Sequence, residues 1–118
     1  MTDRFQRDLL RGSLDLMILS VLVDGAKYGY LIQKRIREAS SDRVKLQAGT
    51  LYPLLHRLEA DKLIRSRWDE TTGRSRKWYE ITPSGKAQLQ KQASEWDEYA
   101  GYMERLLEVV RHMIPKPT

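Results

Sequence analysis

The chain has 118 residues and a net charge of +5, with 41% hydrophobic and 31% charged residues. This length fits one domain with at most one long appendage, and the composition predicts a modest hydrophobic core. Because the sequence contains no cysteine, disulfides, thiolate metal sites and thiol catalysis are excluded.

The N-terminal segment MTDRFQRD is charged and lacks the apolar run of a signal peptide. The strongest apolar stretch, residues 14–23, contains Asp15 and is far too short to cross a bilayer. These features predict a cytoplasmic protein.

Two helices are predicted in the first 40 residues. Residues 9–23 are apolar almost all round, which is typical of a buried helix, and Gly25 is a suitable residue to end it. Residues 28–39 have the period of an amphipathic helix. Its apolar face consists of Tyr28, Leu31, Ile32 and Ile36.

A third helix begins between Gln47 and Thr50 and ends near residues 60–62. Thr50 is a plausible N-cap, which places Pro53 in the first turn, where it is tolerated. If the helix begins earlier, Pro53 removes one hydrogen bond and bends it; the sequence leaves both starts open. The predicted buried stripe is Leu51, Leu54, Leu55 and Leu58.

Residues 63–69 and 75–82 have strand character, and residues 71–73 make a turn between them. The aromatic residues Trp68, Trp78 and Tyr79 are expected to anchor this hairpin. Because neighbouring strand residues face opposite sides, either Trp78 or Tyr79 can remain exposed.

The last helix is predicted to begin at Pro83, with Thr82 as its N-cap. Its apolar residues alternate in steps of four and three, which is a heptad seam. The seam consists of Leu89, Ala93, Trp96, Ala100, Met103, Leu107, Val110 and Ile114. A helix of roughly 30 residues is about 45 Å long, more than a small core can cover. A two-fold dimer is therefore predicted, the alternative being a helix folded back on its own domain.

The third helix presents a polar face directly before a basic hairpin, which is how a winged helix engages DNA. The residues predicted to face outward are Thr50, Tyr52, Pro53, His56 and Arg57. Hydroxyl groups can bond phosphates or base edges, a proline can contact a thymine methyl, and an arginine can fork onto guanine or a phosphate. The alternatives are that Tyr52 packs on the domain and that His56 is simply exposed.

The hairpin tip carries three cations, Arg74, Arg76 and Lys77, and is expected to lie along the DNA backbone or enter the minor groove. Residues 43–91 contain 11 Lys and Arg but 5 Asp and Glu, so the positive excess of the chain lies in this region. This distribution favours a polyanionic partner over an ordinary solvated surface.

The segments RGSLDLMILSVL, YGYL, GTLYPLLHRLEADKLI and GRSRKWYEITPSGK together resemble the PadR family of transcriptional regulators. Trp78 stands where that family commonly has a tyrosine. The resemblance implies a mainly α (α+β) fold, with a winged helix-turn-helix domain in residues 1–82 and a C-terminal dimerisation helix in residues 83–118, as in the compact branch of the family. It also implies a homodimer, usually a repressor, that contacts double-stranded promoter DNA through Thr50, Tyr52, Pro53 and the wing cations, with Tyr30 near a phosphate.

Several members of the family respond to small aromatic or planar compounds near the dimer interface. Trp96 lies on the seam between Ala93 and Ala100, and small neighbours can leave a gap beside its ring. The resulting hypothesis is an effector pocket formed by Trp96 with Tyr99, Met103 and either Leu14 or Met17. The alternative is that Trp96 belongs to the core.

Catalysis is not expected. The two histidines, His56 and His112, are far apart in the sequence, and no phosphate-binding glycine loop or metal motif is present. No cofactor is therefore predicted. The rival to DNA binding is a winged helix that serves as a protein-protein adaptor.

Overall fold

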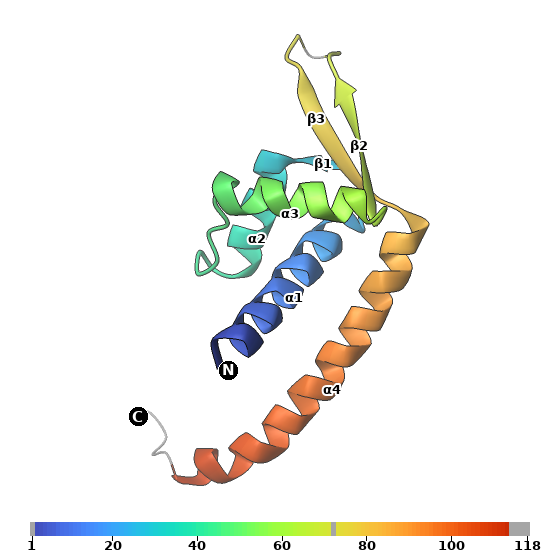
Figure 1. Cartoon of the computed structure of the whole chain (residues 1–118). Coiled ribbons are helices and arrows are strands. Elements are labelled where there is room, and N and C mark those ends of the chain that lie inside the picture. Colours follow the sequence, from blue (N-terminus) through green and yellow to red (C-terminus); the bar gives the residue numbers. More distant parts are fainter. Residues whose placement is uncertain (1, 72, 114–118) are drawn as a thin grey trace.

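The structure is a computed structural model that describes the backbone of residues 2–71 and 73–113 and the side chains of residues 12–71 and 73–113. Its elements in chain order are α1 (Thr2–Leu22), β1 (Lys27–Tyr28), α2 (Gly29–Ala39), α3 (Ala48–Ala60), β2 (Ile64–Asp69), β3 (Arg76–Ile81) and α4 (Pro83–Met113). Helices α1, α2 and α3 form a body from which the β2–β3 hairpin projects, and α4 leads away from the base of that hairpin (Figure 1). The predicted order of four helices and a two-stranded hairpin is confirmed, and β1 is an additional strand that was not predicted.

The core lies where α1, α2 and α3 meet the inner face of the sheet. The buried apolar side chains, none more than 8% exposed, are Ile18, Leu19, Leu22, Ile32, Ile36, Leu46, Leu51, Leu55, Leu58, Ile64, Tyr79 and Ile81. Burying side chains of this size is the main stabilising term for a small domain. The buried first helix and the leucine stripe of the third helix are thus confirmed, with Leu54 half-buried.

The sheet has three antiparallel strands in the order β1-β3-β2. The prediction that Tyr28 begins the second helix was wrong, because Tyr28 has an extended backbone, pairs with Trp78 and caps α2. A two-residue strand is too short to produce an alternating pattern, so β1 left no signal in the sequence.

Helix α3 begins earlier than a Thr50 cap requires. Gln47 is its N-cap, and the amide of Thr50 already donates to the carbonyl of Gln47 at 3.0 Å. Of the two starts that the sequence left open, the earlier one is therefore correct, and Thr50 is not the N-cap. Pro53 consequently lies inside the helix, where it cannot donate to the carbonyl of Gly49. The cost is limited to one hydrogen bond near the N-terminal end.

Helix α4 begins as predicted. The hydroxyl of Thr82 accepts a hydrogen bond from the amide of Gly85 at 3.0 Å and donates one to the carbonyl of Lys62 at 2.7 Å. The hydroxyl thereby ties the start of α4 to the turn between α3 and β2. Gly85 allows this close approach, because a Cβ there would collide with the carbonyl of Leu63.

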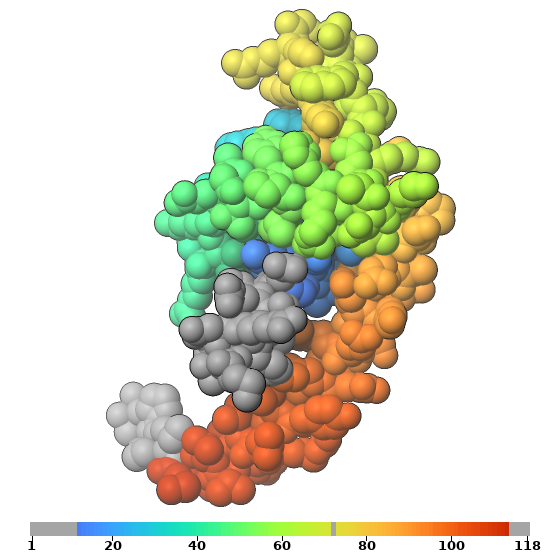
Figure 2. All heavy atoms as spheres, viewed as in Figure 1, coloured from blue at the N-terminus to red at the C-terminus, as the bar shows by residue number. Residues whose placement is uncertain are grey.

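Beyond its first turns α4 continues past the body at the end opposite the hairpin (Figure 2), and the longest dimension of the chain is 58 Å. Leu89 packs against the core, whereas Ala93, Ala100, Met103 and Leu107 are only half-buried. Ile114, the last residue of the predicted seam, lies outside the described residues. Within the described part of the chain, no helix is both long and apolar enough to cross a membrane.

Candidate nucleic-acid interface

The outward face of α3 carries four of the five residues that the sequence predicted there. Thr50, Tyr52, Pro53 and His56 are exposed, and the buried leucines on the opposite side attach the helix to the core. Tyr52 is 41% exposed, yet its ring also rests on α2, where a Cβ on Gly29 would collide with its hydroxyl. Because Gly29 has no side chain, the phenol of Tyr52 can lie against α2, and this contact orients its ring.

Arg57 does not belong to this outward face. Its guanidinium donates to the carboxylate of Asp15 on α1 at 2.5 Å, and Asp15 is only 8% exposed. A nearly buried carboxylate requires such a partner, so the pair holds α3 against α1. The expectation that Arg57 faces outward is corrected by this contact.

The three wing cations have different environments. Arg74 is exposed near the tip, whereas the guanidinium of Arg76 lies 4.5 Å from the ring centre of Tyr28. The ammonium of Lys77 is 3.9 Å from the carboxylate of Glu59 and 6.0 Å from the ring centre of Trp68. Aromatic and acidic neighbours thus orient Arg76 and Lys77, while Arg74 is left to solvent.

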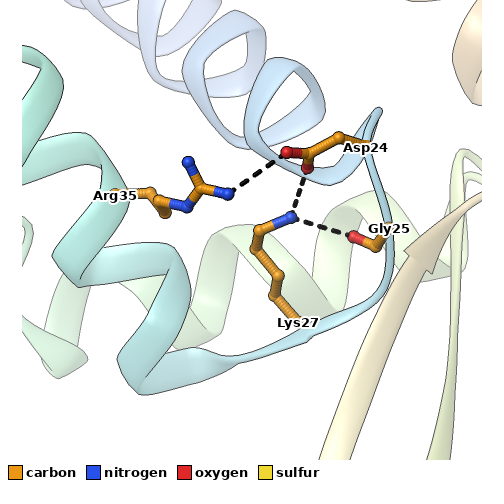
Figure 3. A network of polar contacts seen from close by, with 4 residues as sticks. All are labelled: Asp24, Gly25, Lys27 and Arg35. Carbon is orange, nitrogen blue, oxygen red and sulfur yellow. Dashed lines mark hydrogen bonds and ion pairs between the residues drawn. The ribbon is translucent and has the colours of Figure 1, made fainter.

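A polar network fixes the connection between α1 and α2 (Figure 3). The buried ammonium of Lys27 donates to Asp24 at 2.5 Å and to the carbonyl of Gly25 at 3.2 Å, and Arg35 reaches Asp24 at 3.2 Å. The hydrogen bond and charge of Lys27, followed by the charge of Arg35, lower the pKa of Asp24 below its usual value. The network immobilises the segment that leads into Tyr28.

The next aromatic residue, Tyr30, extends this fixed segment toward solvent. Its ring is stacked beside that of Tyr28 with centres 6.5 Å apart, and it is 55% exposed. Tyr28 in turn meets the ring of Trp78 edge-on at 5.1 Å. The wing is therefore braced against the start of α2 by contacts between aromatic rings.

A hollow of about 470 Å³ lies between the start of α2, the outer face of α3 and the wing. It is lined by Tyr28, Gly29, Tyr30, Tyr52, His56, Trp68, Ser75, Arg76, Lys77 and Tyr79. Five of the predicted DNA contacts thus meet around one concavity, namely Tyr30, Tyr52, His56, Arg76 and Lys77. Thr50, Pro53, Arg57 and Arg74 do not line it.

The three aromatic side chains of the hairpin differ in how far they are buried. Tyr79 is 2% exposed and anchors the hairpin, and burial is the main reason why its pKa is raised. Trp78 is half-buried on the opposite face. Trp68 is 64% exposed, so the prediction that it anchors the hairpin was wrong. Alternation places Trp68 toward the inner face, but near the tip that face extends beyond the core.

Two further hollows adjoin Trp96. One, of about 400 Å³, lies against α1 and the C-terminal end of α2, and another, of about 220 Å³, lies between α1 and α4. Of the predicted effector residues, Trp96, Tyr99 and Met17 line these hollows. Leu14 packs against the core instead, and Met103 lines neither hollow.

The sequence missed two residues of α1 that line both hollows, Ser13 and Leu16. The amide oxygen of Gln92, also in the smaller hollow, is buried without a hydrogen-bond partner among the described residues. An all-apolar helix pattern gave no indication of which α1 residues face Trp96.

A second apolar stripe on α4 was also missed. It consists of Tyr99, Tyr102, Leu106, Val109 and Met113, spaced by three, four, three and four residues. These side chains are 36–77% exposed, whereas Met103 and Leu107 of the predicted seam are half-buried. Within the described chain, the distal half of α4 therefore exposes a wide apolar face.

The arrangement defines a winged helix-turn-helix protein: α2 and α3 are joined by the connection of residues 40–47, and the β2–β3 hairpin follows α3. The model of the transcriptional regulator PadR-like family matches residues 18–91. The chain is 36% identical over 94 residues to the transcriptional regulator Rv3488 of Mycobacterium tuberculosis, covering 80% of this chain and 85% of the relative.

Solved structures agree with this assignment. A transcriptional regulator from Clostridium thermocellum has 33% identity and a TM-score of 0.70, covering 92% of this chain and 99% of the other. A PadR family transcriptional regulator from Eggerthella lenta has 32% identity and a TM-score of 0.74, covering 91% and 92%. The chain belongs to the PadR-like family, whose members are transcriptional regulators and not enzymes.

Proposed function

We propose that this regulator binds promoter DNA in a sequence-specific manner as a homodimeric repressor. The observation that carries the proposal is the continuity between the exposed face of α3 and the hollow beside the cationic wing. Hydroxyl, imidazole, guanidinium and ammonium groups converge there on one side of the domain, which suits a duplex with two negative charges per base pair.

Within the proposed interface, α3 enters the major groove. Thr50, Tyr52 and Pro53 stand near its N-terminal end, where a recognition helix meets base edges. His56 follows one turn later, and Arg74 extends toward the neighbouring groove. Arg57 holds the helix in place through its ion pair with Asp15.

Residues 1–82 carry the DNA contacts in this proposal, and residues 83–118 pair two chains. Support for pairing comes from the apolar stripe of α4, whose Leu106, Val109 and Met113 are 65–77% exposed. Exposed apolar surface of this extent favours association. A dimer presents two copies of α3 to half-sites about one helical turn apart, roughly 34–36 Å, and represses by occupying the promoter.

A planar aromatic effector is the proposed regulator of this binding. Support comes from the 400 Å³ hollow beside Trp96, whose lining includes Leu16, Met17 and Ile36. A ligand there touches α1, α2 and α4 together, so it can change the distance between the two α3 helices and shift the population competent for DNA. Titration of planar dyes into the unaltered protein and into the Trp96→Ala variant tests the proposed effector site. Equal dye affinities of the two proteins would contradict it.

The test of DNA binding itself is the salt dependence of affinity for a random-sequence duplex. Each neutralised phosphate contributes about 0.9 to the slope of log affinity against log salt, so the three wing cations are expected to contribute about 2–3 units per chain. Weak binding with a flat salt response supports the alternative, a protein-protein adaptor.

A further inference from the structure

The indole of Trp68 is the large apolar side chain on the described hairpin that the fold leaves most exposed, at 64%. Its cross-strand partner is Lys77, and the ammonium of that lysine lies 6.0 Å from the ring centre. Trp68 therefore has a neighbour that orients it, and no side chain in the described part of the chain covers it. One face of this indole is therefore available to a partner beside the cationic and hydroxyl groups of the hollow beside the wing.

Dimerisation does not supply that partner. The apolar stripe proposed to pair two chains lies on the distal half of α4, and the hairpin projects at the other end of the molecule (Figure 1). Trp68 instead shares the 470 Å³ hollow with Tyr30, His56 and Arg76. Its surroundings are those of the proposed DNA interface.

Duplex geometry identifies what passes through this hollow. If α3 lies in the major groove and the wing tip reaches the adjacent minor groove, the backbone strand that separates the two grooves must pass between them. A backbone strand alternates phosphates with apolar deoxyribose faces. The hollow offers the matching alternation, with hydroxyl and cationic donors from Tyr30, Arg76 and Lys77 beside the apolar ring of Trp68.

We propose that Trp68 packs against a deoxyribose of this backbone strand, so that the hollow seats one sugar-phosphate segment of duplex DNA. The inference rests on the proposed DNA binding and adds a contact that carries no charge. Trp68 thus contributes to affinity for every sequence without neutralising a phosphate, a combination that distinguishes it from the wing cations.

The experiment measures the affinity of the full chain for a random duplex and for a selected operator, between roughly 50 and 200 mM salt. Trp68→Ala is expected to weaken binding to both duplexes by the same factor, about tenfold, with the salt slope unchanged. Trp68→Phe keeps an aromatic face and should retain most of the affinity. Arg76→Ala serves as the contrast, because it should lower the slope by about 0.9.

Val23→Ala is the matched control, since Val23 is an exposed apolar residue outside the interface, at 50% exposure, and should change nothing. Thermal unfolding checks that the Trp68 variants remain folded. Unchanged affinity of Trp68→Ala on both duplexes overturns the inference. A lower salt slope for Trp68→Ala overturns the proposed sugar contact and indicates that Trp68 acts through Lys77. A loss of affinity for only one of the two duplexes also overturns it and indicates insertion of the ring at a base step. Failure of the unaltered protein to bind any duplex instead overturns the proposed function.

Discussion

The surface around α3 and the wing differs from the distal half of α4 in what it leaves exposed. The first exposes hydroxyls, imidazole and cations, with the rings of Tyr30 and Trp68 among them, supported from behind by a dense core. Water solvates the polar groups well. The second exposes Leu106 at 70% and Met113 at 77% with no described element covering them. The polar surface needs a partner only to function, whereas the apolar surface is incompletely buried without one.

Introducing a charge on α4 should have the largest effect on operator affinity. It would also show whether the two regions have different roles, one in dimerisation and the other in DNA contact. Leu106→Glu places a carboxylate in the proposed dimer interface, where it would lose its hydration. We expect a monomer with an intact core, whose operator affinity falls by about 10²–10⁴-fold because bivalent binding is lost. Light scattering and DNA titration measure the two effects.

Glu108→Gln is the control for that experiment, because Glu108 is exposed on the opposite side of α4. It should leave both the mass and the operator affinity unchanged. A Leu106→Glu protein that remains dimeric, or a monomer that binds as tightly as the unaltered protein, contradicts the division of roles between the regions.

The ion pair between Asp15 and Arg57 connects α3 to the α1 helix that lines the Trp96 hollows. Asp15→Ala leaves a half-buried guanidinium without its partner and should lower the free energy of unfolding by about 2 kcal/mol. The double variant Asp15→Ala/Arg57→Met should recover part of this loss. Urea unfolding of the double variant and of the two single variants, Asp15→Ala and Arg57→Met, measures the coupling, and additive losses would show that the pair contributes nothing.

Two substitutions at the DNA-facing surface should have smaller effects that differ in kind. Tyr52→Phe keeps the ring against Gly29 and removes only the hydroxyl, so operator affinity should fall about three- to tenfold more than random-duplex affinity. Arg76→Ala should weaken both equally and lower the salt slope by about 0.9. Equal losses on both duplexes for Tyr52→Phe would remove that residue from base reading.

The smallest predicted effect concerns acid stability at the Asp24 network. Because Lys27 lowers the pKa of Asp24 in the folded chain, its contribution is present above the ordinary value of 3.8 and is lost as the pH falls through the lower folded pKa. Between about pH 5 and pH 2 the Tm of the unaltered protein should fall more steeply than that of Asp24→Asn. Parallel curves would show that the network makes no pH-dependent contribution.

Most of the fold could be predicted because its determinants are local. The leucine spacing of α3, the alternation of the strands and the Thr82-Pro83 start of α4 each act within a few residues. The sequence limited the start of α3 to residues 47–50 but did not decide within that range, since Gln47 caps the helix through its backbone conformation and makes no side-chain capping hydrogen bond. Thr50 resembles a better cap but lies inside the first turn.

The site was predicted less well wherever a distant element decides the environment of a side chain. Arg57 has the spacing of an outward residue, and only the approach of Asp15, 42 positions earlier, shows its role. Trp68 faces inward by alternation, but the core ends before the tip of the hairpin. Leu14 and Leu16 are indistinguishable in an apolar helix until α4 is in place beside α1.

The central claim is that α4 holds two copies of the α3-wing surface at a fixed distance on DNA. Selection of bound sequences from random duplexes tests it most directly. We expect an inverted repeat whose half-sites are about 10–10.5 base pairs apart, centre to centre. Enrichment of a single unpaired motif, or no enrichment over random DNA, would contradict it.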